Sequence, residues 1–117
     1  MILPIDKNHQ INKDSNQPLF EAGQLVRHRR YNYRGVIVER DLTYRGTEQW
    51  YQKNNTQPHR EQPWYHVLVD GAMLETYAAH SSLGADVQAT EVEHPLVEVF
   101  FSGFINGRYV RNDRPWG

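Results

Sequence analysis

Short apolar runs separated by turn residues dominate this chain, and the first two lie close together. Residues 23–28 read Gly-Gln-Leu-Val-Arg-His, and residues 35–40 place the β-branched triplet Val-Ile-Val after a glycine. Short runs rich in β-branched residues are typical of strands. The residues between them, Tyr31 to Gly35, include the asparagine and glycine that turns favour. This pattern predicts a hairpin, in which either Leu25 or Val26 faces inward on the first strand.

Two more strands are predicted in the middle of the chain. Residues 63–69, Pro-Trp-Tyr-His-Val-Leu-Val, form the strongest strand pattern in the sequence. Asp70 and Gly71 follow as turn residues. Residues 74–78 then form a further short strand.

One short helix is predicted between the hairpin and these strands, over residues 47–53. Thr47 is a favourable N-cap, and Glu48 and Gln49 follow it in the first turn. A helix this short is not stable alone. We therefore expect Trp50 to pack it against the rest of the domain.

The C-terminal part of the chain predicts a second hairpin. Asn106-Gly107 stands between the run at 97–105 and the residues Arg-Tyr-Val-Arg, and Asn-Gly favours the type I′ turn of hairpins. An alternative remains open at the start of this segment. Phe100 to Phe104 can instead begin as a helical turn after His94-Pro95.

About five short strands with one short helical insertion predict a mainly β fold, a small and strongly bent β-barrel. The 117 residues are the length of one domain. We assign residues 1–19 to a polar N-terminal leader, 20–112 to the β domain and 113–117 to a C-terminal tail.

The composition excludes several classes of protein. The chain has no cysteine, which excludes disulfides, thiol catalysis and cysteine-ligated metals. No apolar run is long enough to cross a membrane, and the first ten residues do not resemble a secretory signal. We expect a soluble cytoplasmic protein without a membrane partner.

The charges are unevenly distributed, although the net charge is only −1. Residues 27–45 carry six arginines, and residues 86–98 carry four carboxylates without a lysine or arginine. A chain with separate basic and acidic segments is expected to steer charged partners.

Residues with catalytic or metal-binding chemistry are scattered. The six histidines form neither an HxH nor an HExxH pair, and His66 within a strand is interpreted as a packed residue. Glu91 and Glu93 alternate around Val92 and are interpreted as part of a solvated acidic loop. We predict no catalytic residues, no metal and no cofactor. A hydrolase would require a pocket that holds His66 beside a carboxylate.

The arginines and tyrosines of the first hairpin are the candidate binding residues. Arginine offers a planar pair of donors to phosphate, and exposed tyrosines stack on bases. Two other interpretations stay open: an acidic protein partner, and a structural hairpin with solvated arginines. The candidate DNA-binding set is Arg27, Arg29, Arg30, Tyr31, Tyr33, Arg34, Arg40 and Arg45.

Four blocks of the sequence carry a resemblance to a known family. They are Phe20 to Val38, Glu48-Gln49-Trp50, Gln62 to Asp70 (QPWYHVLVD) and Thr76 to Ala79. In order and spacing they resemble the YccV-like, or hemimethylated-DNA-binding, domain, whose best-known member is heat-shock protein Q. The segment from His94 to Tyr109 is similar to a longer branch that includes domains attached to F-box proteins.

The resemblance implies an SH3-like barrel, non-enzymatic and cytosolic, that forms trimers or larger rings. It also implies two alternative functions: binding of duplex DNA, hemimethylated DNA in particular, and modulation of substrate degradation by Lon protease. The residues themselves favour DNA binding over recognition of one methyl group, because none visibly reads the adenine edge. Because the positive charge is clustered, we expect Arg29→Glu with Arg34→Glu to abolish duplex binding and to leave thermal stability nearly unchanged.

Overall fold

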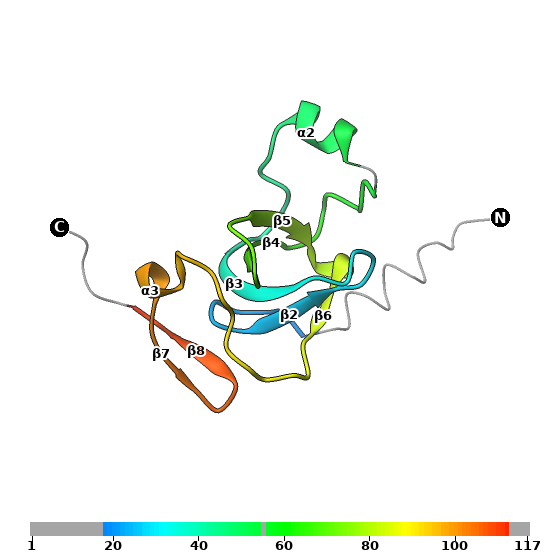
Figure 1. The fold of residues 1–117 in the computed structure, drawn as a ribbon. Helices are drawn as coiled ribbons and strands as arrows, with labels where there is room; N and C mark the ends of the chain where they lie inside the picture. Colours follow the sequence, from blue (N-terminus) through cyan, green and yellow to red (C-terminus); the bar gives the residue numbers. More distant parts are fainter. Residues whose placement is uncertain (1–17, 55, 113–117) are drawn as a thin grey trace.

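Within residues 18–54 and 56–112 the chain folds into two antiparallel β-sheets and three short helical segments (Figure 1). This computed structural model describes residues 18–54 and 56–112. The first sheet contains β2 (Leu25–His28), β3 (Arg34–Asp41), β4 (Trp64–Val69), β5 (Glu75–Ala79) and β6 (Leu83–Ala85). The second contains β7 (Phe101–Ile105) and β8 (Arg108–Arg111). The helical segments are α2 (Glu48–Lys53), η1 (His80–Ser82) and α3 (Val97–Phe100).

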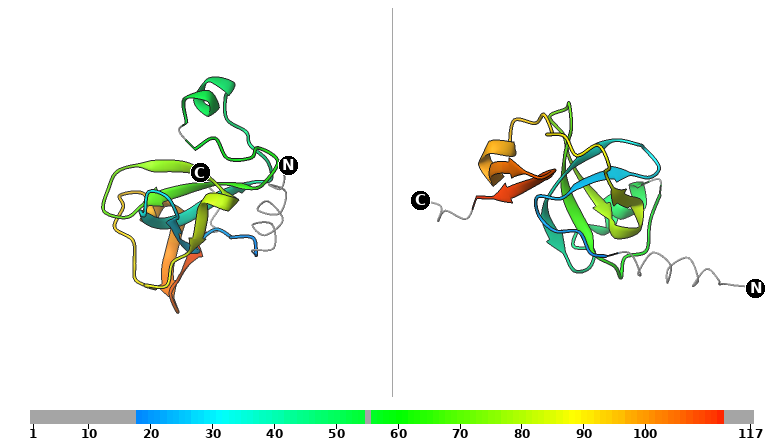
Figure 2. Two further views of the ribbon diagram at one scale, coloured as in Figure 1. Left: turned by 90° about the vertical axis from the view of Figure 1, so that its right-hand side faces the viewer. Right: turned by 90° about the horizontal axis from the view of Figure 1, so that it is seen from below.

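The first sheet has the strand order β5-β4-β3-β2-β6 and curls strongly (Figure 2). Within the described ranges its edge strands β5 and β6 do not pair with each other. The prediction of a mainly β fold is confirmed, whereas a closed barrel is not. The predicted leader and tail fall largely on residues 1–17 and 113–117, which lie outside the described ranges.

Both faces of this sheet are covered, which resolves the two possibilities for the first strand. Val26 packs with Phe20, Ile37 and Tyr65 on one side. Leu25 packs on the other side, in a cluster with Leu68, Phe101 and Tyr109 among others. Leu25 and Val26 are therefore both inside, because the second sheet covers the face that a lone hairpin leaves to solvent.

The first hairpin is confirmed, but its turn lies earlier than predicted. Strand β3 begins at Arg34, and residues 29–33, here called the β2–β3 turn, connect it to β2. Asn32 takes the left-handed conformation there, with φ of 62°. Gly35 serves a different purpose, because a Cβ on it would lie 2.3 Å from the Leu68 carbonyl oxygen.

Two elements next to β5 were not predicted. The 3-10 helix η1 follows β5 directly, and β6 then pairs with β2 across Val26–Ala85 and His28–Leu83. Strand β6 is only three residues long. Its sequence, Leu-Gly-Ala, has little strand propensity of its own, so its pairing depends on β2.

The C-terminal segment contains a helical turn as well as the hairpin, but the turn lies earlier than the alternative of Phe100 to Phe104 placed it. Val97–Phe100 is one helical turn, and the strand begins at Phe101. Asn106 and Gly107 have φ of 54° and 77°, as a type I′ turn requires. The second hairpin is therefore confirmed, and its Phe101 and Tyr109 pack on the first sheet.

Residues 42–54 and 56–63, here called the α2 arm, project from the first sheet on the side away from β7 and β8 (Figure 2). Thr47 is the N-cap as predicted, and its hydroxyl accepts the Trp50 N–H at 3.0 Å. The Arg60 guanidinium donates to both carboxylate oxygens of Glu48, at 2.7 and 3.0 Å. These hydrogen bonds, with one from Gln52, lower the pKa of Glu48 to about 2.

Candidate nucleic-acid interface

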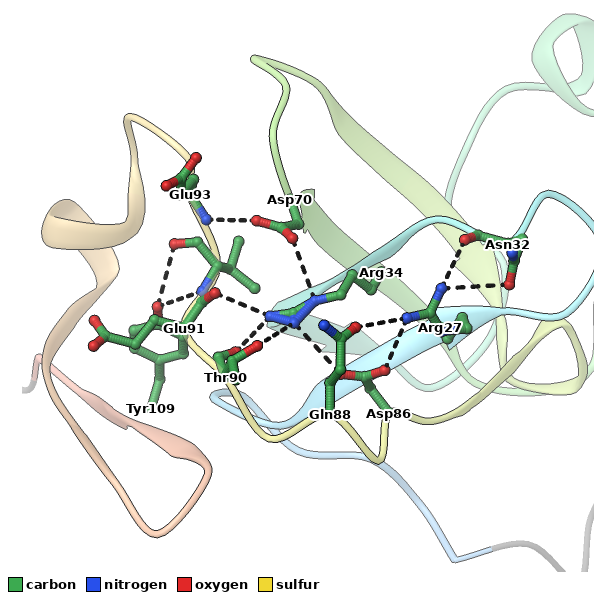
Figure 3. Close-up of polar contacts among 11 residues, drawn as sticks. Arg27, Asn32, Arg34, Asp70, Asp86, Gln88, Thr90, Glu91, Glu93 and Tyr109 are labelled. Atoms are coloured by element: carbon green, nitrogen blue, oxygen red, sulfur yellow. Dashed lines mark hydrogen bonds and ion pairs between the residues drawn. The ribbon is translucent and has the colours of Figure 1, made fainter.

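Arg34 is a buried structural residue, and its guanidinium lies among Asp70, Asp86 and Thr90 (Figure 3). Only 7% of its side chain is exposed, and its Nε and Nη1 lie 3.3 Å from Asp70 and 3.6 Å from Asp86. It also donates to the Thr90 hydroxyl and to the carbonyl oxygens of Thr90 and Glu91. Arg34 thus joins the start of β3 to the end of β4 and to the acidic segment.

Arg27 shares one of these carboxylates. Its Nη2 lies 3.3 Å from Asp86 and donates to Gln88 at 2.9 Å, while Nη1 donates to the Asn32 carbonyl at 3.0 Å. The Asp86 side chain is only 1% exposed. Part of the basic segment therefore neutralises part of the acidic one, which revises the expectation of two separate charged regions.

The burial of Arg34 also revises the expectation for the double substitution. Arg34→Glu would place a third carboxylate beside Asp70 and Asp86, so loss of DNA binding in that variant would not separate binding from unfolding. The DNA-binding role of the eight candidate residues remains a prediction.

The β2–β3 turn presents three exposed members of the candidate set, and Arg40 and Arg45 are exposed elsewhere. Arg29 and Arg30 are exposed there, and 52% of Tyr31 is exposed. The Arg30 guanidinium lies 5.8 Å from the centre of the Tyr31 ring. Arg29 donates its Nε hydrogen to the Leu83 carbonyl at 3.1 Å.

His28 holds this turn in shape from inside. Its Nδ1 accepts the backbone N–H of Arg30 at 3.1 Å and of Tyr31 at 3.0 Å. Its ring also stacks on those of Tyr31 and Tyr33, with centroids 4.8 and 5.1 Å apart. Burial, and next the charge of Arg30, lower the pKa of His28, so the neutral form that accepts both bonds is favoured. Nothing in the sequence indicated this role.

Tyr33 differs from Tyr31 because it packs against the core. Its hydroxyl lies 2.7 Å from the Thr76 hydroxyl on β5. Burial is the main cause that raises the pKa of Tyr33. Stacking on a base would require this ring to leave its packing site, whereas Tyr31 already faces solvent.

Arg40 and Arg45 lie toward the other end of β3. At about 3.3 Å per strand residue, Arg34 and Arg40 are roughly 20 Å apart along the strand. Arg40 donates to the Phe20 carbonyl at 3.2 Å, and the backbone N–H of Arg45 donates to the Tyr77 hydroxyl at 3.0 Å. The structure therefore brings Arg29, Arg30 and Tyr31 together and keeps Arg40 and Arg45 apart from them.

A cleft of about 490 Å³ runs beside β5, between the β2–β3 turn and the α2 arm. All five β5 residues line it, and we call it the β5 cleft. Aromatic rings line it from both sides, with Tyr31 and Tyr33 from the turn and Trp50 from the arm. The predicted packing of Trp50 is confirmed, since its ring centroid lies 6.3 Å from that of Trp64 and 5.9 Å from that of Tyr77.

His66 lines the β5 cleft between two carboxylates. Its Nδ1 lies 3.0 Å from Glu75 and its Nε2 3.4 Å from Asp41. The Tyr77 hydroxyl donates to Asp41 at 2.6 Å, and burial followed by this carboxylate raises the pKa of Tyr77. The pocket that a hydrolase would require, with His66 beside a carboxylate, is thus present. Each of the two imidazole nitrogens faces a carboxylate of the protein itself.

The described ranges contain neither a metal-binding cluster nor a membrane-spanning helix. Residues 18–54 and 56–112 contain no group of three His, Asp or Glu side chains arranged to hold a metal ion. The same part of the chain contains no helix that is both long and apolar enough to span a membrane.

Comparison with known families places this geometry in context. The family model described as hemimethylated DNA-binding protein YccV like matches residues 18–108, which is most of the chain. The chain belongs to the YccV-like family. In this YccV-like domain the match covers all the strands of the first sheet and the β2–β3 turn.

The YccV-like domain is also similar to part of larger curated proteins. It is 34% identical over 96 residues to F-box only protein 21 of Homo sapiens, and equally to that of Pongo abelii and of Mus musculus. These matches cover 80% of this chain but only 15% of each relative. The chain thus corresponds to one segment of these relatives.

Proposed function

We propose that this YccV-like domain is a non-catalytic duplex DNA-binding module whose β2–β3 turn contacts the phosphate backbone. The observation that carries the proposal is the separation of the arginines into two groups. Arg27 and Arg34 are paired with Asp86 at the base of the turn. Arg30 is exposed on the turn beside Tyr31, and so is Arg29, which donates to the Leu83 carbonyl. Arg40 and Arg45 are exposed toward the other end of β3. The description of the family as hemimethylated DNA-binding supports the choice of DNA as partner.

The physical argument is that arginine binds phosphate through two parallel donors. A projecting turn can reach a DNA groove or the phosphate backbone with little rearrangement of the sheet. Arg27 and Arg34 stabilise the start and end of this turn. A single turn neutralises few phosphates. We therefore expect weak binding by one copy, strengthened when the domain assembles into a trimer or larger oligomer as the resemblance implies.

The proposal is tested by titrating the protein against one duplex in methylated, hemimethylated and unmethylated form, at two salt concentrations. We expect all three to bind and their affinities to fall with salt. Arg30→Glu is expected to weaken binding to each. Arg108→Glu is the matched control, with the same change of charge on the C-terminal hairpin, far from the turn (Figure 1).

Equal loss of affinity in both variants would contradict the proposal, because it would indicate a response to net charge alone. A preference for the hemimethylated duplex would extend the proposal from the backbone to base recognition. Absence of binding to any duplex at low salt, by protein that remains folded, would overturn it.

A second candidate function is modulation of substrate degradation by Lon protease, which the resemblance implies. Exposed apolar residues favour a protein partner: Met73 is 83% exposed, and Leu74, beside it before β5, is also exposed. A degradation assay with purified Lon, with and without the domain, tests this function separately. We expect Met73→Ser with Leu74→Ser to abolish any effect on degradation while duplex binding is kept.

Cytosolic location and oligomeric state remain predictions.

A further inference from the structure

Strand β5 has a free edge along the β5 cleft. It is the outermost strand of the sheet and pairs with β4 alone within the described ranges. The Val69 N–H donates to the Leu74 carbonyl and the His80 N–H to the Pro63 carbonyl. The even-numbered residues from Leu74 to His80 therefore direct their backbone N–H and C=O groups toward β4. Antiparallel geometry then directs those of Glu75, Tyr77 and Ala79 away from it, toward the cleft.

This edge lacks three of the features that prevent strand addition. Natural edges are blunted by proline, lysine or a bulge. The sequence of β5, Glu-Thr-Tyr-Ala-Ala, contains no proline or lysine. Its five pairs with β4 run without a shift in register, in contrast to β3, which has an irregularity between Ile37 and Glu39. An edge that is regular and unprotected can accept another strand.

The two faces of β5 present different surroundings to such a strand. Thr76 and Ala78 lie opposite Val67 and Tyr65, on the side where Tyr33 packs. Glu75 and Tyr77 lie on the other side, where Tyr77 stacks on Trp64 at 5.3 Å. An added strand would thus place alternate side chains against apolar groups on one side and against aromatic rings and Glu75 on the other.

The charge of the cleft identifies the kind of strand. Glu75 is its acidic lining residue, with 44% of its side chain exposed, and among the described residues the lining contains no lysine or arginine. A cationic side chain in the cleft would meet the Glu75 carboxylate and the faces of the neighbouring rings, which attract cations. The bases of a single-stranded nucleic acid could stack on these rings, but its phosphates would lie near the Glu75 carboxylate, which repels them.

From these observations we infer that the β5 cleft binds an extended, basic peptide segment of a partner protein, which pairs with β5 as an additional strand. The backbone groups of Glu75, Tyr77 and Ala79 form the ladder, and Glu75 with Tyr77 selects lysine or arginine. This site is separate from the proposed DNA contact, except that Tyr31 belongs to both surfaces. Addition of a strand to a sheet edge is an established mode of peptide recognition.

The test uses three capped hexapeptides as probes: one of alternating valine and lysine, one with glutamate in place of lysine, and the lysine peptide N-methylated at alternate residues. Binding is followed by backbone NMR of the labelled full chain. We expect the lysine peptide to slow amide hydrogen exchange at Glu75, Tyr77 and Ala79. The glutamate peptide should bind at least about tenfold more weakly than the lysine peptide. The N-methylated peptide should not bind.

Two variants separate charge from backbone pairing. Glu75→Gln keeps the N–H and removes the charge, so it should bind the lysine and glutamate peptides equally. Glu75→Pro also removes the outward N–H at the first residue of an edge strand, where proline is tolerated, and should bind neither. Arg30→Glu, which tests the DNA contact, should leave the lysine peptide affinity unchanged.

Several results would overturn the inference. One is failure of the lysine peptide to slow exchange at the three amides of the folded wild-type protein. Another is binding of the glutamate peptide to the wild type with the same affinity as the lysine peptide. Protection of these amides that depends on protein concentration without peptide would assign the edge to a second copy of the chain. Displacement of the lysine peptide by an oligothymidine strand would assign the cleft to nucleic acid.

Discussion

Arg34 Nη1 lies 3.6 Å from Asp86 Oδ2, and both side chains are almost completely buried. This pair connects the most basic segment of the chain with the most acidic one. Its consequence for function is indirect. By holding the base of the β2–β3 turn, Arg34 leaves phosphate binding to residues that project beyond it, where Arg29, Arg30 and Tyr31 are exposed.

Replacement of Arg34 is expected to destabilise the fold. Arg34→Met removes a cation from beside Asp70 and the buried Asp86, which keeps only Arg27 within the described residues, at a cost of about 3 kcal/mol in the free energy of unfolding. Urea denaturation measures this change. Arg30→Met is the matched control, and we expect a change of about 0.5 kcal/mol or less because Arg30 is exposed. A similar small change for Arg34→Met would contradict its structural role.

Acid is expected to loosen the β2–β3 turn through His28. The pKa of His28 is lowered below 6.5 in the folded protein, so between the two values the unfolded chain binds more protons. The contribution of His28 to stability is therefore full above pH 6.5 and falls as the pH drops below it, by at most about 1.4 kcal/mol per pH unit.

The control for this effect is His28→Asn, whose amide oxygen can accept a backbone N–H but does not titrate. We expect the stability of the wild type to fall more steeply than that of the variant between pH 6.5 and more acidic values, by chemical denaturation at each pH. Parallel curves would indicate that the other histidines account for the whole effect.

Loss of the helix cap is expected to release the α2 arm without unfolding the sheet. Thr47→Ala removes the acceptor of the Trp50 N–H, at a local cost of about 1 kcal/mol. No residue of α2 is buried, so the main transition should change little. Faster hydrogen exchange at the Trp50 amide, with the β4 amides unaffected, is the expected result. Thr47→Ser, which keeps an acceptor, should behave as the wild type.

A methyl group at position 35 is expected to disrupt the centre of the first sheet. The Cβ of Gly35→Ala would meet the Leu68 carbonyl oxygen and the Val67 side chain at 2.3 and 2.7 Å. We expect a loss of about 1–3 kcal/mol in the free energy of unfolding. Gly103→Ala is the matched control, because no heavy atom lies within 4 Å of its added Cβ. Equal effects of the two changes would contradict the close approach of β3 and β4.

The sequence predicted most local structure because local residues determine it. Thr47 caps the helix through its own hydroxyl, and Asn106-Gly107 adopts the positive φ values that the hairpin requires. Strand β6 was missed because its three residues depend on pairing with β2. These outcomes show that an element is predictable when its own residues supply the turn, cap or propensity.

The candidate site was less predictable, because its residues depend on partners far along the chain. Arg34 and Arg30 look alike in the sequence, and only the position of Asp70 and Asp86 separates a buried ion pair from an exposed cation. The β5 cleft likewise forms from the turn, the α2 arm and an edge strand. Which strand becomes an edge follows from the order of the whole sheet.

The most direct test of the DNA contact is the salt dependence of duplex affinity for the wild type and for Arg30→Ala. Each phosphate neutralised contributes about 0.9 to the slope of log affinity against log salt concentration. We predict a slope smaller by about 0.9 for Arg30→Ala, with the free energy of unfolding unchanged. An unchanged slope in a variant that still binds the duplex would show that the β2–β3 turn does not contact the phosphates.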